Sequence, residues 1–210
     1  MSPASRSPSA VLKTLRRLMW AAAFVMAVVI AAYHLRPQPT GPALPVLQTV
    51  PAFSLTDRDG ASFGLDDLAG KPWVADFVFT RCPGVCPIMS QRMQALIADM
   101  PAGLARYVSV SVDPTYDTPE ILQAYAEKHD AGPDWHFLTG PEDTVYTLIK
   151  QGFLLALDPS PRQEGAEPIV HSNRFVLVDG AGHIRGYYNS FDDEELAKLR
   201  VDLKALASAR

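Results

Sequence analysis

Cysteine is scarce in this chain, which holds only two among its 210 residues, Cys82 and Cys86. Two thiolates are too few for structural zinc, which takes four ligands. A structural disulfide between residues four apart would close a very small loop and would constrain the unfolded chain little. The stretch that contains both, "FVFTRCPGVCPIMSQRM", is therefore expected to carry chemistry.

Basic residues are few in the larger part of the chain. All 23 acidic residues lie after residue 36, whereas five of the 19 basic residues lie at or before it, so residues 37–210 carry a formal charge of −9. Such a surface repels phosphate, and this excludes nucleic acid as an expected partner. The acidic surface also serves solubility, so it identifies no partner by itself.

Long apolar runs are limited to the sixteen uncharged residues from Leu18 to Tyr33. As a helix this run rises about 24 Å, somewhat less than a hydrocarbon core of about 30 Å. Lys13, Arg16 and Arg17 stand just before it. The positive-inside rule then predicts a single-pass inner-membrane anchor over 18–35, with 1–17 in the cytoplasm and the rest in the periplasm or an equivalent exported space. A cleaved signal peptide is the alternative, but no convincing small-x-small cleavage site follows the run.

The remainder divides into a linker and one domain. Residues 36–50 hold four prolines, which prevent helix and favour an extended spacer. Residues 51–210 are the size of a single domain with its own core, and they contain no internal repeat or low-complexity tract.

Strand and helix patterns alternate along that domain, which predicts an α/β fold. The apolar run "WVADFVF" suits a buried central strand that leads into the cysteine loop and a helix. This layout predicts a thioredoxin-like fold, a central mixed sheet flanked by helices, with an N-terminal hairpin extension turning at Asp59-Gly60 and the one transmembrane helix. Further strands are predicted over 106–113 and 173–189, and helices over 88–100, 117–130, 141–152 and 192–206.

The cysteine loop suggests reactive sulfurs. Pro87 suits the first turn of a helix, so the helix is expected to begin at or just after Cys86. Both sulfurs would then lie at a helix N-terminus, near the cation of Arg81, and the pKa of each thiol should fall. Three interpretations stay open: a structural disulfide, a redox-active dithiol, or part of a metal site. Cu(I) is a soft ion that accepts two thiolates and an imidazole.

Five histidines could supply such an imidazole. His171 stands where a long loop enters a buried strand, a position from which side chains reach a site at the ends of a sheet. From the residues alone it is a candidate ligand and no more. The others have simpler explanations at the membrane boundary, a helix end, a turn or the packing of a short apolar run: His34, His129, His183 and His136.

Four motifs resemble the Sco/SenC family: "FTRCPGVCP", "SVDPTYDTPEILQAYA", "LTG" and "VHSNRFVLVDGAG". They occur in the family's order, and the resemblance runs from about Pro51 to the C-terminus. It implies a membrane-anchored thioredoxin fold that carries copper to the CuA centre of cytochrome c oxidase. Cys82, Cys86 and His171 match the copper ligands. Asp113 matches an acidic position near the metal, although a turn-capping role explains it equally well.

The sequence departs from the common family pattern at three places near this site. Arg81 stands where histidine is frequent, Tyr116 where a basic residue is usual, and Val170 where an aspartate often precedes the ligand histidine. None of the three changes removes a ligand. The changes at 81 and 116 are expected at the rim of the site, where they could alter which partner docks.

Two functions follow from these residues. One is a metallochaperone, not an enzyme, which binds copper through Cys82, Cys86 and His171 and passes it to the CuA-bearing oxidase subunit. Other copper carriers or thiol reductants would be further partners. The other is a thiol-disulfide oxidoreductase that uses Cys82 and Cys86 to reduce cysteines of the oxidase subunit or of another exported protein. His171 discriminates between them, because thiol exchange needs no imidazole ligand.

Overall fold

The computed structural model describes residues 8–34, 44–155 and 172–208. Residues 8–34 form one long helix, α1 (Pro8–His34), which belongs to a separate unit from the domain that follows. The sequence predicts a membrane-spanning helix over 18–35, but no helix among the described residues combines the length and the hydropathy that a membrane crossing requires.

One mixed sheet of eight strands organises the described part of the domain, in the order β1-β8-β7-β4-β5-β6-β2-β3. Strands β4, β5 and β6 are parallel, and the other neighbouring pairs are antiparallel. The strands are β1 (Gln48–Thr49), β2 (Ser54–Asp57), β3 (Ser62–Gly64), β4 (Trp73–Val78), β5 (Arg106–Ser111), β6 (Trp135–Thr139), β7 (Arg174–Val178) and β8 (His183–Asn189).

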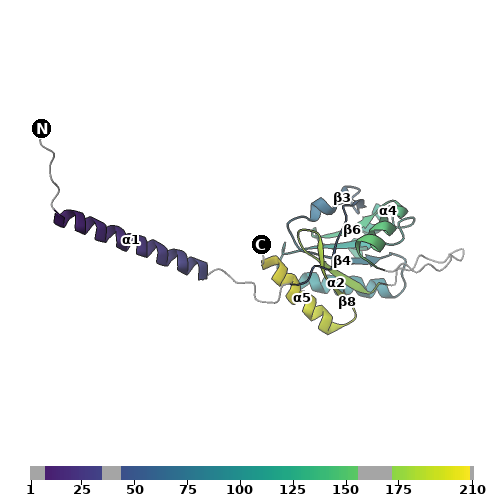
Figure 1. Ribbon diagram of the computed structural model, residues 1–210. Helices are drawn as coiled ribbons and strands as arrows, with labels where there is room; N and C mark the ends of the chain where they lie inside the picture. The colour runs from purple at the N-terminus through teal and green to yellow at the C-terminus, as the bar shows by residue number, and fades with distance from the viewer. Residues whose placement is uncertain (1–7, 35–43, 156–171, 209–210) are drawn as a thin grey trace. The chain divides into compact units, whose positions relative to one another are not determined.

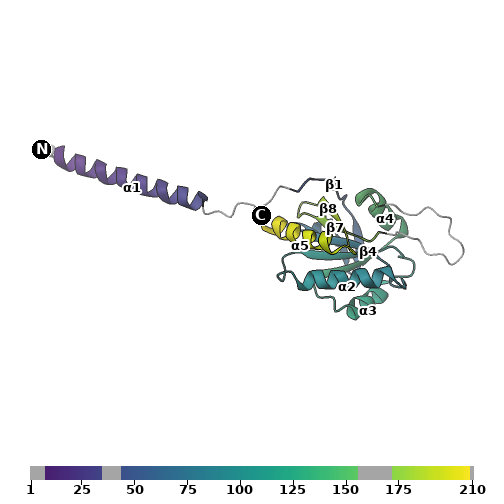
Figure 2. The ribbon, with the colours of Figure 1, turned by 90° about the horizontal axis from the view of Figure 1, so that it is seen from below.

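Helices cover both faces of this sheet (Figures 1 and 2). On one face lie α2, α3 and α5, whose apolar side chains form a core with Val74, Tyr107 and Phe175. On the other lie α4 and two short helices, packed on Trp73 and Phe77. The helices are α2 (Val85–Ala98), α3 (Pro119–Lys128), α4 (Glu142–Thr147) and α5 (Asp193–Ser208), with a 3-10 turn η1 (Leu65–Leu68) and a π-helical turn η2 (Leu148–Gly152).

Strand β4 forms where the sequence predicts the central strand. All six of its residues are buried, because helices cover both faces and strands lie on both sides. Its parallel pairing with β5 needs a crossover connection, which α2 provides. The hairpin of β2 and β3 also forms as expected, and Gly60 takes a φ of +82° in its turn, a conformation that glycine adopts without strain. The predicted mixed sheet with a hairpin extension is confirmed.

The helix predicted over 141–152 differs from the observed structure in its second half. It is α-helical only to Thr147 and continues as the π-helical turn η2 to Gly152. The wider turn carries Leu148 and Ile149 into the core together with Phe153, so packing overrides the regular period that the sequence indicates. Helix α3 begins as predicted, with the Thr118 side chain accepting the N–H of Ile121 at 3.4 Å.

Candidate functional site: the cysteine loop

Cys82 lies in the loop that joins the end of β4 to α2, and Cys86 follows it across the start of that helix. Helix α2 begins at Val85, one residue earlier than expected, so Cys86 is already in its first turn. Both cysteines are free thiols. The N–H of Cys86 donates to the Sγ of Cys82 at 3.4 Å, and the N–H of Cys82 donates to the carbonyl of Phe79 at 3.2 Å. The loop therefore turns the sulfur of Cys82 back toward unpaired N–H groups of the helix.

Burial makes the two thiols unequal. Burial acts to raise the pKa of Cys82, but the N–H groups of Cys86, Gly84 and Val85, together with the Cys86 thiol, outweigh it, so that the pKa of Cys82 is lowered. Cys86 is only 5 % exposed, and burial raises its pKa, with the Cys82 sulfur and the charge of Asp76 adding to the rise. The expectation that both thiol pKa values fall is thus wrong for Cys86, because desolvation outweighs the helix terminus.

Asp113 lies beside the loop, where its carboxylate is already engaged by side chains. It is 3 % exposed; Arg81 Nη2 lies 2.5 Å from its Oδ2, and Thr115 Oγ1 donates to its Oδ1 at 3.2 Å. The guanidinium of Arg81 also lies over the ring of Tyr116, 4.1 Å from its centroid. The carboxylate of Asp113 therefore fixes Arg81, and Arg81 and Tyr116 meet at the rim as expected.

Asp117 was missed by sequence reasoning, although it holds the cysteine loop in place. Its buried carboxylate accepts the hydroxyl of Thr80 at 2.5 Å, the N–H of Thr80 at 3.2 Å and the hydroxyl of Ser111 at 2.6 Å. Through these three hydrogen bonds, the buried carboxylate of Asp117 links Thr80 in the cysteine loop to Ser111 at the end of β5. The motif "SVDPTYDTP" contains two aspartates, Asp113 and Asp117. The sequence predicts a place near the site only for Asp113, although Asp117 stands in the same motif.

Asp76 was also missed, because it stands inside the apolar run of β4. It is fully buried on the face covered by α2, and Ser109 Oγ donates to its Oδ1 at 2.6 Å. The indole N–H of Trp135 donates to Ser109 Oγ at 2.9 Å, so the proton of the Ser109 hydroxyl points to Asp76. Oδ2 has no hydrogen-bond partner among the described residues. Burial raises the pKa of Asp76 to about 7.

His171 lies outside the described residues, so its distance to the sulfurs stays a prediction. Within the described ranges, no group of three or more histidine, cysteine or acidic side chains is placed to hold a metal ion. Three other histidines make structural contacts away from the cysteine loop. His136 Nδ1 lies 2.6 Å from Asp57, His183 Nδ1 lies 3.3 Å from Asp179, and His129 packs on the ring of Tyr125.

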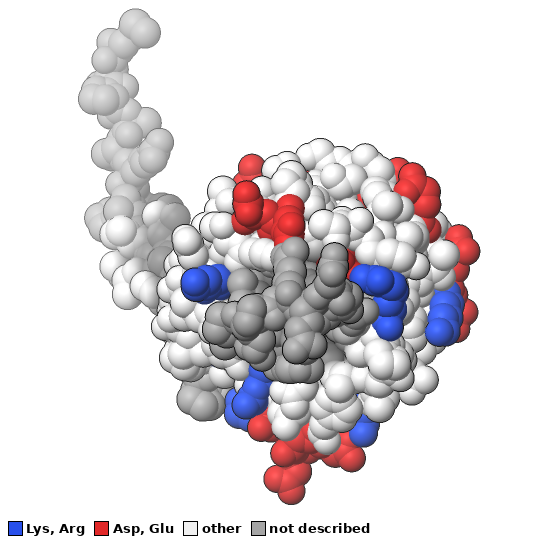
Figure 3. Space-filling model, turned by 90° about the vertical axis from the view of Figure 1, so that its right-hand side faces the viewer, with Lys and Arg blue, Asp and Glu red and all other residues white. Residues whose placement is uncertain are grey.

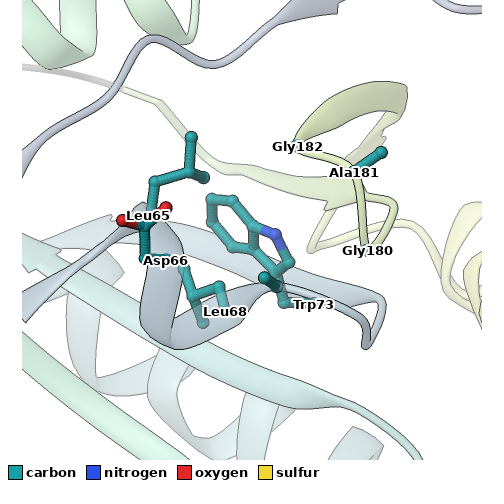
Figure 4. A pocket seen from close by; sticks show the side chains of 8 residues that line it. Leu65, Asp66, Leu68, Trp73, Gly180, Ala181 and Gly182 are labelled. Carbon is teal, nitrogen blue, oxygen red and sulfur yellow. The ribbon is translucent and has the colours of Figure 1, made fainter.

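A small cavity of about 170 Å³ lies at the opposite end of β4 from the cysteines. Figure 4 shows the indole of Trp73 between Leu65 and Leu68 on one side and the turn from Gly180 to Gly182 on the other. Trp73 is the first residue of β4, whereas the cysteine loop follows its last residue. Six residues of strand separate the two places by about 16 Å or more, so the cavity is not part of the cysteine site.

Similarity to known proteins extends over most of the domain. The sequence pattern of the family described as SCO1/SenC matches residues 43–206. The crystal structure of a SCO1/SenC family lipoprotein from Bacillus anthracis is 34 % identical, with a TM-score of 0.71, covering 79 % of this chain and 99 % of that one. BsSco, described as a Sco-family cytochrome c oxidase assembly protein with a disulfide switch, is 28 % identical with a TM-score of 0.69, covering 79 % and 97 %. Copper-bound ScoI from Bradyrhizobium japonicum is 27 % identical with a TM-score of 0.60, covering 75 % and 99 %.

Proposed function

The chain belongs to the SCO1/SenC family, and from this premise we propose that it is a copper-binding metallochaperone that delivers copper to the CuA site of cytochrome c oxidase. Cys82, Cys86 and His171 are the proposed ligands. The observation that carries the proposal is the pair of free thiols on one loop, with Cys82 held in a thiolate-favouring turn. The copper-bound relative and the relative described as an oxidase assembly protein support the metal and the acceptor.

The chemistry of the pair suits a soft ion that must be released again. Cys82 is partly exposed and favours the thiolate, so it can meet copper first. Cys86 is buried and holds its proton, so copper must displace that proton to gain the second sulfur. A site in which one ligand is costly to ionise gives copper up more readily to an acceptor with two cysteines, such as the CuA-bearing subunit.

Spectroscopic titration of the reduced full chain with Cu(II) tests the ligand set. We expect a 1:1 complex with sulfur-to-copper charge-transfer absorption, lost in Cys82→Ser and Cys86→Ser and markedly weakened in His171→Ala. His183→Ala is the matched control, since His183 begins β8 beside Asp179, and its loss should leave the spectrum unchanged. Absorption that survives both serine substitutions would remove the cysteines from the proposal.

The unequal thiols also favour a second function, thiol-disulfide exchange. A lowered pKa on the partly exposed Cys82 and a raised pKa on the buried Cys86 suit a nucleophile and a resolving thiol. The substrate would be a disulfide of the oxidase subunit or of another exported protein. Stopped-flow reduction of a peptide disulfide by the copper-free chain separates the functions: exchange should be lost in Cys82→Ser and retained in His171→Ala.

We further propose that the domain works in an exported compartment and is held at the membrane through its N-terminal helix. The described side chains of α1 from Leu18 to Ile30 are apolar and exposed, and a relative is described as a lipoprotein. Fractionation of cells that express the full chain tests this. The domain should sediment with membranes and be digested by protease added from the exported side, whereas protection from that protease would contradict the orientation.

A further inference from the structure

Strand β8 binds the chain on both sides of residues 156–171 through side-chain hydrogen bonds. Before this segment, the hydroxyl of Tyr187 donates to the carbonyl of Phe153 at 3.1 Å. After it, the side-chain amide of Asn173 donates to Oδ1 of Asn189 at 2.9 Å. We call these two bonds the first and the second anchor. Tyr187 and Asn189 are two residues apart on β8, so the anchors leave the strand within about 7 Å of each other.

The first anchor is attached to the core beside β4. Phe153 is 1 % exposed, and its ring makes edge contacts with those of Phe77 and Trp73 at centroid distances of 5.0 and 6.0 Å. The N–H of Leu155 also donates to the carbonyl of Ile149 at 3.3 Å. Since Phe77 lies near the end of β4, the chain enters the segment beside the strand that leads into the cysteine loop.

The second anchor lies at the same end of the sheet. Asn189 pairs with Arg174, the first residue of β7. In the antiparallel register of β7 with β4, Val176 lies opposite Ala75. Two residues further on, Arg174 reaches the level of Phe77, near the end of β4. Because neighbouring strands are about 4.8 Å apart, Asn189 lies about 10 Å across the sheet from β4.

Asn189 is itself held in place by further bonds. Its Oδ1 also accepts the N–H of Phe191 at 3.0 Å, and its own N–H donates to Glu195 Oε2 at 2.5 Å, in the first turn of α5. The carbonyl of Asn173 accepts the N–H of Ser190 at 2.8 Å. The second anchor is therefore joined both to the sheet and to α5.

Charge is a weak means of holding the same segment on the domain. Residues 156–171 contain three acidic residues and one arginine, and residues 37–210 together carry a formal charge of −9. On the face in Figure 3, the described Lys and Arg side chains stand as separate spots. Attraction between unlike charges therefore contributes little, and the anchors at the two ends matter more.

We propose that Tyr187 and Asn189 are positioning residues that bring the imidazole of His171 to the cysteine sulfurs. Fixing both ends of a segment limits the volume that its side chains can visit, which raises the effective concentration of the imidazole at the end of β4. His171 stands two residues before Asn173, so the second anchor should constrain it more than the first. This inference rests on the proposed function, since it takes His171 as a copper ligand.

Competition of the reduced full chain with a chromophoric Cu(I) chelator tests the inference. Tyr187→Phe removes one hydroxyl and should lower the Cu(I) affinity about threefold, whereas Asn189→Ala removes two accepted hydrogen bonds and should lower it about five- to tenfold. Asn189→Asp keeps the accepting oxygen and should stay within about twofold of wild type. Tyr188→Phe is the matched control, because the Tyr188 hydroxyl donates to Asp202 on α5 at 2.6 Å, and its affinity should not change.

Double variants separate positioning from a merely structural role. Without the imidazole there is nothing to position, so adding Tyr187→Phe or Asn189→Ala to His171→Ala should change its affinity by less than about twofold. An equal loss with and without the imidazole, or wild-type affinity in both single variants, would overturn the inference. If Asn189→Ala does not fold, Tyr187→Phe and its control decide in the same assay.

The two proposals can be told apart in this experiment. Wild-type affinity in His171→Ala would remove the imidazole from the proposed function, and the inference would fall with it. Weak binding in His171→Ala beside wild-type affinity in Tyr187→Phe and Asn189→Ala would contradict the inference alone. Exchange with a peptide disulfide needs no imidazole and should keep its wild-type rate in Tyr187→Phe, whereas a slower rate would show a disturbed cysteine loop and count against positioning.

Discussion

Burial separates two cysteines that look equivalent in the sequence. The sulfur of Cys82 accepts the N–H of Cys86, whereas Cys86 lies in the first turn of α2 and is only 5 % exposed. The motif and its proline predicted the helix start to within one residue. They could not predict which sulfur is covered, because that depends on how α2 packs on the sheet.

The Cys86 thiol contributes to the low pKa of Cys82, so its removal should be measurable. In Cys86→Ala the hydrogen bond from this thiol is lost while the backbone donors remain, and the pKa of Cys82 should rise. The pH profile of iodoacetamide alkylation at Cys82 reports this as a shift to higher pH. A shift to lower pH would mean that the buried thiol opposes the Cys82 thiolate.

Asp76 should make stability depend on pH. Its folded pKa of about 7 lies above the ordinary value of 3.8, so the folded state holds this proton more tightly. The resulting stabilisation is full below the unfolded pKa and is lost as pH rises through 7. Relative to Asp76→Asn, the wild-type free energy of unfolding should fall by about 1–3 kcal/mol between pH 5 and pH 8.

Urea unfolding at both pH values measures the Asp76 effect. Asp66→Asn serves as the control, because Asp66 is exposed and should follow the wild-type curve. Parallel curves for wild type and Asp76→Asn would show that this carboxylate does not titrate in the range. The sequence shows Asp76 as a carboxylate in the middle of an apolar strand. The apolar pattern predicts a buried strand but does not predict what this carboxylate contacts.

At the scale of elements, the site depends on contacts between segments that lie apart in the sequence. Sequence patterns predicted β4, the hairpin, the cap of α3 and the apolar side of α5, because each follows from local period or turn chemistry. They did not predict η2 or the role of Asp117. Both depend on packing or hydrogen bonds across residues distant in sequence, which single-sequence periods do not encode.

The hydrogen bonds between Asp117 and Thr80 should stabilise the cysteine loop. In Asp117→Ala three donors lose their acceptor, and the free energy of unfolding should fall by about 1–3 kcal/mol, the cost of buried donors left unpaired. Urea unfolding measures the loss, and hydrogen exchange at the Thr80 amide should accelerate. Asp143→Ala, at an exposed position, is the control. Equal free energies of unfolding for Asp117→Ala and wild type would show that the hydrogen bonds of Asp117 do not stabilise the fold.

At the scale of the whole molecule, the sequence predicted one α/β domain behind an N-terminal apolar segment, and the structure contains both units. The family match spans the domain and not α1. No helix in the described part of the chain has the length and hydropathy to cross a membrane, so the predicted spanning anchor is not confirmed. The site lies at the end of β4 where Cys82, Arg81 and Tyr116 meet solvent. The proposed exchange of copper or sulfur with a partner protein requires such an exposed position.

The central claim, that the chain carries copper on Cys82, Cys86 and His171, is tested most directly by Cu(I) affinity. The reduced full chain would compete with a chromophoric Cu(I) chelator, as wild type, His171→Ala and the control His183→Ala. We predict one Cu(I) per chain, with affinity at least about tenfold lower in His171→Ala and unchanged in His183→Ala. Equal affinity of wild type and His171→Ala would contradict the claim and leave a dithiol protein without its imidazole ligand.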